Sequence, residues 1–247
     1  SSVMDAAERN LRVRDPLMLF EIGPVFLPPA EGQLPEEPIR LALVFSGSAG
    51  LPAWDQPVAR KLDFYDLKGA LESLLADLHI PAPVFESAAE GPYHPGKCAV
   101  ISSGGQRLGI FGELHPLVKE RFDLGPAPVL CAELELGALL AAAPGRYEAA
   151  SVSSYPPVLE DIAVVVDESL PAEQVAALIR QTGGKLLVGL RLFDVFRSEQ
   201  IGAGKKSLAY ALTYQAPDRT LNEKESAQIR QRIIRRLEQE LGAKLRS

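Results

Sequence analysis

Large and small side chains alternate along Ser207-Leu-Ala-Tyr-Ala-Leu-Thr-Tyr214, and this segment decides the fold of the second half of the chain. Neighbouring side chains on an extended strand point to opposite faces of a sheet. The leucines and tyrosines therefore supply one face for a core. The opposite face carries only the small side chains of Ser207, Ala209, Ala211 and Thr213. We expect a central strand with one buried face and one open face.

Further strands are predicted on both sides of this segment. Ile162, Val164 and Val166 alternate with other residues in a first strand, so they also provide one face for a core. Another strand is expected at about 186–196, and a loop that contains two glycines separates it from the central strand, which covers about 205–214. A short strand is expected at the end of the chain.

Two helices are expected to connect these strands. Ser169 is predicted to cap the first helix, which Gly183-Gly184 ends. Thr220-Leu-Asn-Glu223 has the pattern of a capping box, and the helix that it opens ends at Gly242. The resulting β-α-β-β-α-β unit is ferredoxin-like, with both helices on one face of a four-stranded antiparallel sheet.

The other face of that sheet is expected to be open. An open face of small side chains lets flat groups approach the backbone, as when RNA-binding modules stack single-stranded bases on a sheet. Small residues also occur on sheet faces that contact only solvent or a neighbouring domain. The pattern alone leaves both interpretations open.

The first half of the chain predicts a mixed α+β domain, with a largely antiparallel sheet and helices packed against it. Asp63 is expected to cap the longest of these helices, which carries leucines at helical spacing. The predicted strands cover 16–26, 39–46, 98–102, 108–114 and 129–134, and the short helices cover 3–11, 117–122 and 136–142.

A boundary between two domains, 1–150 and 151–247, is expected near residue 150. Small residues, prolines and glycines accumulate without periodicity at 143–157. Charge divides there too, because residues 1–150 have 12 basic and 20 acidic side chains, net −8, and residues 151–247 have 14 and 12, net +2. A polyanion is therefore expected to prefer the second domain.

The composition predicts a cytoplasmic protein with no membrane partner. No apolar run approaches the roughly 20 residues that span a bilayer, and no signal-peptide pattern begins the chain. Cys98 and Cys131 stand in apolar segments, which favours two buried thiols in a reducing compartment over a disulfide. The chain begins at Ser1 inside a predicted helix, so we expect it to be a piece of a longer protein.

Four segments of the second domain carry a family resemblance. They are Tyr-Pro-Pro-Val-Leu-Glu-Asp-Ile-Ala (155–163), Leu-Phe-Asp-Val-Phe (192–196), Lys-Lys-Ser-Leu-Ala (205–209) and Arg-Thr-Leu (219–221). Their order and spacing resemble the anticodon-binding domain of the β subunit of bacterial phenylalanyl-tRNA synthetase. The chain departs from that family at Glu160, where the family has Arg. A carboxylate there would repel phosphate.

A segment of the first domain resembles class II aminoacyl-tRNA synthetases. Leu19-Phe-Glu-Ile-Gly-Pro-Val-Phe-Leu-Pro-Pro29 is similar to their strand Phe/Tyr-Glu-Ile-Gly-x-x-Phe-Arg-x-Glu. Leu27 stands at the position of the Arg that holds the ATP phosphates in that class, and Pro29 stands at the position of the Glu. Leucine has neither the charge nor the bidentate geometry that phosphate needs. The Gly-rich segment at 109–115 has no Arg either.

The first domain therefore resembles the catalytic-like module of the same β subunit, which keeps the class II fold without its catalytic motifs. The segments Phe64-Tyr-Asp-Leu-Lys-Gly69, Tyr93-His-Pro-Gly96 and Gly112-Glu-Leu-His-Pro116 support the resemblance, which covers nearly the whole chain. The combined fold class is α+β, with a class II synthetase-like antiparallel sheet domain followed by a ferredoxin-like domain.

The resemblance implies a non-catalytic part of an aminoacyl-tRNA synthetase that assembles from two α and two β subunits. The partners are then the α subunit, which activates phenylalanine, and tRNA(Phe), with no DNA. ATP and Mg are expected elsewhere in the holoenzyme, and no cofactor or metal in this piece. An exposed apolar patch is expected on the first domain, and tRNA contacts are expected from Asp161, Arg191, Phe193, Ser207, Ala209 and Thr213.

Other interpretations have weaker support. Gly202-Ala-Gly-Lys-Lys-Ser207 departs from the phosphate-loop pattern, so a hairpin loop is favoured. His94, Glu113 and His115 can converge in a fold, but their spacing is not that of a metal site. The arginines at 230–236 are expected on a solvated helix face. The rival functions are an active class II ligase and a regulatory small-molecule-binding ferredoxin-like module fused to a degenerate ligase core.

Overall fold

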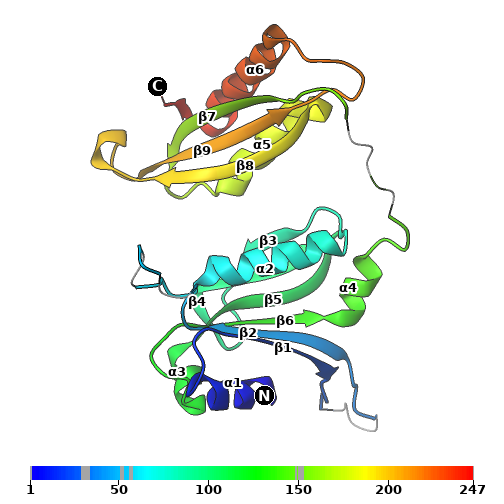
Figure 1. Ribbon diagram of the computed structural model, residues 1–247, viewed down its shortest axis with the longest axis vertical. Coiled ribbons are helices and arrows are strands. Elements are labelled where there is room, and N and C mark those ends of the chain that lie inside the picture. Colours follow the sequence, from blue (N-terminus) through cyan, green and yellow to red (C-terminus); the bar gives the residue numbers. More distant parts are fainter. Residues whose placement is uncertain are drawn as a thin grey trace. The chain divides into compact units, whose positions relative to one another are not determined.

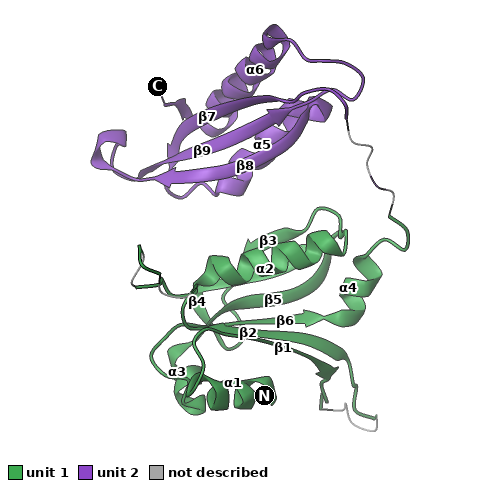
Figure 2. Cartoon of the chain, in the orientation of Figure 1, with its two compact units in different colours: residues 1–148 green, residues 149–247 purple. Residues whose placement is uncertain are grey.

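The chain forms two compact units, residues 1–148 and 149–247 (Figure 2). The computed structural model describes residues 2–28, 34–50, 53–55, 58–147, 149 and 153–246. No helix within these residues is both long enough and apolar enough to cross a membrane.

The first unit is built on a six-stranded antiparallel sheet in the order β1-β2-β6-β5-β4-β3 (Figure 1). The strands are β1 (Leu17–Pro24), β2 (Ile39–Ser46), β3 (Val84–Ser87), β4 (Tyr93–Ser103), β5 (Gln106–Leu114) and β6 (Val129–Glu135). The predicted hairpin is confirmed as β4 and β5, which turn at Gly104 and Gly105, both at positive φ. The short strand β3 lies outside the predicted elements.

Helices cover both faces of this sheet. They are α1 (Ser2–Leu11), α2 (Phe64–Asp77), α3 (Pro116–Lys119), which a 3-10 turn (Glu120–Phe122) extends, and α4 (Leu136–Ala142). Leu67, Leu71 and Leu75 of α2 are fully buried against the sheet in a core that α4 also joins. Ala7 of α1 lies in the core on the opposite face. Asp63 caps α2 as predicted, in a capping box with Asp66.

The second unit is a four-stranded antiparallel sheet in the order β10-β7-β9-β8. Its elements are β7 (Val158–Asp167), α5 (Ala172–Gly183), β8 (Leu187–Phe196), β9 (Lys205–Tyr214), α6 (Glu223–Leu241) and β10 (Lys244–Leu245). Figure 1 shows both helices on one side of the sheet. The predicted ferredoxin-like arrangement is confirmed.

The alternation in β7 and β9 builds the core of this unit as predicted. The face toward the helices consists of large apolar side chains that are almost fully buried: Ile162, Val164, Val166, Leu208, Tyr210, Leu212 and Tyr214. Val175 and Ile179 of α5 and Ile229, Ile233 and Leu237 of α6 pack against them. At about 1.5–3 kcal/mol for each large side chain removed from water, this layer is the main support of the unit.

Both predicted caps in the second unit are wrong. The residue before α5 is Pro171, and Ser169 makes no cap hydrogen bond there. The cap of α6 is Asn222, which forms a capping box with Glu225. Two overlapping cap patterns, Thr220 to Glu223 and Asn222 to Glu225, have the same spacing. Because Leu221 is buried in the core, the chain stays extended past Thr220 and the helix starts later.

Cys98 and Cys131 are buried free thiols, as expected. Both pair in register with Gly112, Cys98 from β4 and Cys131 from β6, so the width of β5 separates them. Two strand spacings amount to about 9–10 Å, which exceeds the reach of a disulfide. Burial raises the pKa of the Cys131 thiol to about 12.

Replacing Asn222 should destabilise the second unit if this residue caps α6, whereas replacing Thr220 should destabilise it only if Thr220 were the cap. We expect Asn222→Ala to lower the free energy of unfolding by about 1 kcal/mol, because the backbone N–H of Glu225 in the first turn loses the side-chain oxygen that accepts its hydrogen bond. Thr220→Ala is the matched control, because Thr220 is exposed and caps nothing. Urea unfolding followed by circular dichroism measures both changes. An equal loss for Thr220→Ala would contradict the observed cap.

Candidate nucleic-acid interface

The face of the second sheet that the helices leave uncovered has a floor of small side chains on its central strand. Ser207, Ala209, Ala211 and Thr213 of β9 all point to this face, because the alternate residues lie in the core. We call it the open face. Ala163 of β7 pairs with Ala209 and widens the small-residue floor.

Charged and aromatic side chains border this floor. Asp161 of β7 pairs with Ala211 from one side, and Arg191 of β8 pairs with Ala211 from the other. A bulge in β8 inserts Phe193, whose ring centroid lies 5.9 Å from the Arg191 guanidinium carbon. Asp161, Arg191 and Phe193 are exposed to solvent.

All six residues predicted for tRNA contact therefore lie on this one face, although their side chains differ in exposure to solvent. Phe193 is 47% exposed, whereas Ala209 is 9% and Ser207 only 1% exposed. Thr213 lies opposite Gly189 of β8, which has no side chain to cover it. Ala209 and Thr213 thus form the floor, and Ser207 lies beneath another side chain.

That covering side chain is Arg246, which the sequence analysis missed. Its backbone N–H donates to the Ala163 carbonyl at 2.8 Å and places the residue beside β7. Its guanidinium carbon lies 4.7 Å from the centroid of the Phe196 ring, and its Nη1 lies 3.4 Å from the Ser207 hydroxyl oxygen. Arg246 thus reaches across three strands of the open face.

Alternation in the last strand could have revealed this contribution. Lys244 pairs with Val165, whose side chain points to the open face, and Arg246 lies two residues further on. Within the described part of the chain, Arg191, Lys244 and Arg246 form no ion pair with a carboxylate. Three cations at the rim are therefore available to a polyanion.

Basic residues at the β8–β9 loop are already engaged. Lys205 contacts Asp167 at 2.6 Å, and Arg197 contacts Glu168 at 2.8 Å. Hydrogen bonds from Arg197 lower the pKa of the Glu168 carboxyl below its usual value. The loop itself carries Gly202 and Gly204 at positive φ, and it is the hairpin connection predicted in place of a phosphate loop.

Glu160 lies on the side of the sheet that the helices cover, away from the open face. It alternates with core residues along β7, and its Oε2 lies 3.4 Å from Nε of Arg230 on α6. Burial, and then the nearby Glu160 carboxylate, raise the pKa of the Tyr214 hydroxyl above its usual value. The Glu160 charge therefore faces a helix arginine and not the open face.

The histidines of the first unit have structural contacts. Nδ1 of His94 accepts the backbone N–H of Gly96, and Nδ1 of His115 accepts that of Leu117 at the start of α3. The two imidazole rings lie 6.4 Å apart. Among the residues that the structure describes, no group of three or more His, Cys, Asp or Glu side chains could hold a metal ion.

The first unit does present an apolar surface along its edge strand β1. Met18, Phe20 and Ile22 are 51%, 72% and 53% exposed. They pair with Phe45, Leu43 and Leu41 of β2, so they point to the sheet face that carries α2 and α4. Ile39 and Phe26 extend this exposed surface, which we call the β1 patch. The predicted exposed apolar patch is confirmed.

The β1–β2 connection keeps no phosphate-binding chemistry at its described positions. Leu27, which stands where class II enzymes have Arg, forms an isolated β-bridge with Glu36. Its side chain offers no charge to an anion. Pro29, the second departure from that pattern, lies outside the described residues.

Comparisons with known proteins agree with this geometry. A family model for the ferredoxin-fold anticodon binding domain matches residues 153–246. A second model, the phenylalanyl tRNA synthetase beta chain CLM domain, matches residues 1–136. The second unit is thus an anticodon-binding domain of the ferredoxin fold. The chain belongs to the phenylalanyl-tRNA synthetase β chain family.

Two relatives show how much of that family's length the chain represents. The phenylalanine–tRNA ligase beta subunit of Symbiobacterium thermophilum is 42% identical over 238 residues, which are 96% of this chain and 26% of the relative. That of Moorella thermoacetica is 42% identical over 248 residues, which are 99% of this chain and 30% of the relative. The chain therefore spans less than a third of these curated relatives.

Among solved structures, pyrrolysyl-tRNA synthetase from Desulfitobacterium hafniense aligns with 56% of this chain and 46% of its own, at 17% identity and a TM-score of 0.42. That likeness is too weak to argue from. None of the comparisons favours a regulatory module.

Substitutions of two adjacent carboxylates test which face of the sheet each of them lies on. We expect Glu160→Gln to lower the free energy of unfolding by up to about 1 kcal/mol, because Arg230 loses its charged partner. Asp161→Asn, on the open face, should change it by less than about 0.5 kcal/mol. Urea unfolding of the two variants makes the comparison. A larger loss for Asp161→Asn than for Glu160→Gln would contradict the assignment.

Proposed function

We propose that this chain is the non-catalytic portion of a phenylalanine–tRNA ligase β subunit that reads the anticodon of tRNA(Phe) on the open face of its second unit. The observation that carries the proposal is the floor of small side chains on β9, bordered by Arg191, Phe193 and Arg246. Flat bases need such a floor, and an RNA backbone needs the cations at its rim.

The open face offers distinct contacts to anticodon bases. A base can lie flat over Ala209, and the exposed rings of Phe193 and Phe196 provide stacking surfaces beside it. The Asp161 carboxylate can accept a hydrogen bond from an exocyclic amine or a ring N–H. Ser207 becomes available when the Arg246 guanidinium turns toward a phosphate.

Binding by this unit should depend on base identity more than on charge. A stacked base contributes about 1–3 kcal/mol. The net charge of +2 over residues 151–247 gives only weak attraction to any polyanion. Anticodon identity is then the main source of selectivity.

In this proposal, aminoacylation takes place in another subunit of the enzyme. The α subunit activates phenylalanine with ATP and Mg, and this chain forms no aminoacyl-adenylate, because Leu27 cannot hold a phosphate. The chain acts within a cytoplasmic assembly of two α and two β subunits.

The first unit has an assembly role, with the β1 patch as its contact to the α subunit. Five exposed apolar side chains on one edge are costly to leave in water and are typical of protein interfaces. The net charge of −8 over residues 1–150 makes this unit a poor surface for RNA and leaves contact with protein as its main role.

A bulky charge on the floor tests anticodon recognition. In the complete β subunit, Ala209→Glu should weaken tRNA(Phe) binding by about 5- to 150-fold, because losing one stacked base costs about 1–3 kcal/mol. Gln239→Glu is the matched control, since it places the same side chain on the exposed surface of α6. Filter binding with cognate and anticodon-swapped tRNA gives the affinities. Equal binding of the two tRNAs by the unmodified protein, or no effect of Ala209→Glu, would refute recognition by this face.

A charge in the β1 patch tests the contact with α. Phe20→Asp should abolish copurification of the α subunit with the complete β subunit, because a carboxylate would be buried in an apolar interface. Leu117→Asp is the control, at a similarly exposed apolar residue on α3. Size-exclusion chromatography shows whether the subunits remain together. An intact assembly with Phe20→Asp would exclude the β1 patch as the contact.

A further inference from the structure

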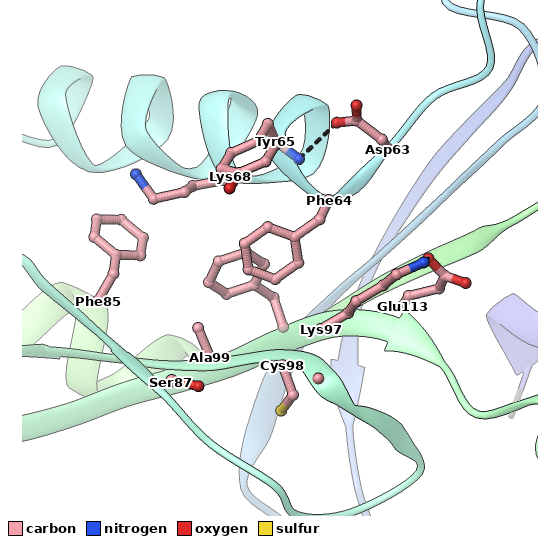
Figure 3. A pocket seen from close by; sticks show the side chains of 12 residues that line it. Asp63, Phe64, Tyr65, Lys68, Phe85, Ser87, Lys97, Cys98, Ala99 and Glu113 are labelled. Atoms are coloured by element: carbon pink, nitrogen blue, oxygen red, sulfur yellow. Dashed lines mark hydrogen bonds and ion pairs between the residues drawn. The ribbon is translucent and has the colours of Figure 1, made fainter. Parts of the chain in front are cut away.

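The first unit contains a cavity of about 420 Å³ between the start of α2 and strands β3, β4 and β5 (Figure 3). Its volume lies within the range of about 300–1,000 Å³ that is typical of small-molecule sites. It is lined by aromatic, charged and small side chains, and neither the open face nor the β1 patch shares a residue with it.

Three phenylalanine rings form the apolar part of this cavity. Phe64 stacks on Phe111 at 4.8 Å and 25°, and Phe85 meets Phe111 edge-on at 6.0 Å and 90°. Figure 3 shows Phe85 apart from Phe64, with Ala99 below and Lys68 above. The Lys68 ammonium lies 4.6 Å from the Phe85 centroid. These walls suit a flat ring, which gains offset or edge-on aromatic contacts and a nearby cation.

An adjacent ion pair forms the polar part. Nζ of Lys97 lies 2.6 Å from Oε2 of Glu113, and Figure 3 shows this pair on the other side of Phe64 from Phe85. Lys97 is half exposed, so water or a ligand can reach its ammonium. Asp63 lies at the start of α2, where its carboxylate accepts the Tyr65 backbone N–H at 2.8 Å and caps the helix.

The charges decide which ligand chemistry fits. A nucleoside triphosphate needs a surplus of cations, whereas Lys68 and Lys97 are each paired, with Glu72 and Glu113. A purely apolar ligand would desolvate the Lys97–Glu113 pair without replacing its water contacts. An α-amino acid carries an ammonium and a carboxylate on one carbon, so it needs an acceptor and a donor side by side. Glu113 and Lys97 supply that arrangement.

We propose that this cavity binds a free aromatic α-amino acid. The ring lies between Phe64 and Phe85, the α-ammonium donates to Glu113, and the α-carboxylate accepts from Lys97. No bond is made or broken. This site is independent of the anticodon interface and of the contact with α.

The experiment measures binding to the 247-residue chain alone, so that no other ligand site of a larger assembly contributes. The probes are L-phenylalanine, L-tyrosine, 3-phenylpropanoate, 2-phenylethylamine, L-leucine and ATP, followed by saturation-transfer NMR and calorimetry. We expect saturable binding of both aromatic amino acids, at least tenfold weaker binding of the two analogues that lack one charge, and weaker binding of leucine. No saturation by either amino acid up to about 10 mM, or preferential binding of ATP, would overturn the proposal.

Two pairs of variants locate the site. Phe85 and Ser87 both line the cavity from β3, whereas Glu86 between them does not. Ser87 and Glu86 are both exposed, so a tryptophan at either position leaves the core unchanged. Ser87→Trp should fill the cavity and reduce L-phenylalanine affinity at least tenfold, and Glu86→Trp should leave it unchanged.

The second pair of variants tests whether the Glu113 carboxylate binds the ligand's ammonium group. Glu113→Gln should weaken the amino acid at least tenfold but leave 3-phenylpropanoate unchanged, because that analogue has no ammonium. Glu90→Gln is the matched control, since Glu90 is also ion-paired, with Arg107, and does not line the cavity. Binding that survives both Ser87→Trp and Glu113→Gln would place the ligand elsewhere and overturn the proposal.

Discussion

The second unit depends on one constraint, which is that the two faces of strand β9 differ in side-chain size. Tyr210 and Tyr214 reach into the core under α5 and α6, and Ala209 and Ala211 leave the opposite face flat. The same backbone therefore supports the fold on one side and leaves a flat face on the other, where we propose that anticodon bases bind. A large apolar residue on the open face would add a second surface that requires cover.

Opposite faces also explain why Glu160 is compatible with the proposed RNA binding. Adjacent residues of a strand point apart, so Glu160 faces Arg230 of α6 while Asp161 faces the open side. A residue that looks unfavourable in a linear motif is thus neutralised by a helix from the end of the chain. Its effect concerns the stability of the unit more than the ligand.

In the first unit, by contrast, helices cover both faces of the sheet. Cover is incomplete at the edge strand β1, where apolar side chains stay exposed, and at β3, where a cavity remains beside α2. Buried leucines and Phe111 hold this unit together. Leu27, which stands at the arginine position of the class II pattern that the sequence resembles, belongs to neither core cluster, so a change at this position leaves the core intact.

The sequence by itself determined most of the elements and the faces of strand β9, because alternation and helical spacing are local properties, but it gave no sign of the short strand β3. It placed β9 at its observed bounds, and alternation put Asp161, Ser207, Ala209 and Thr213 on one face. Only the tertiary structure decided that Asn222 and not Thr220 caps α6, because burial of Leu221 delays the helix start. The position of Arg246 over Ser207 and the cavity beside Phe85 likewise depend on residues far apart in the chain. Such contacts form only when strands and helices pack, and no periodicity records them.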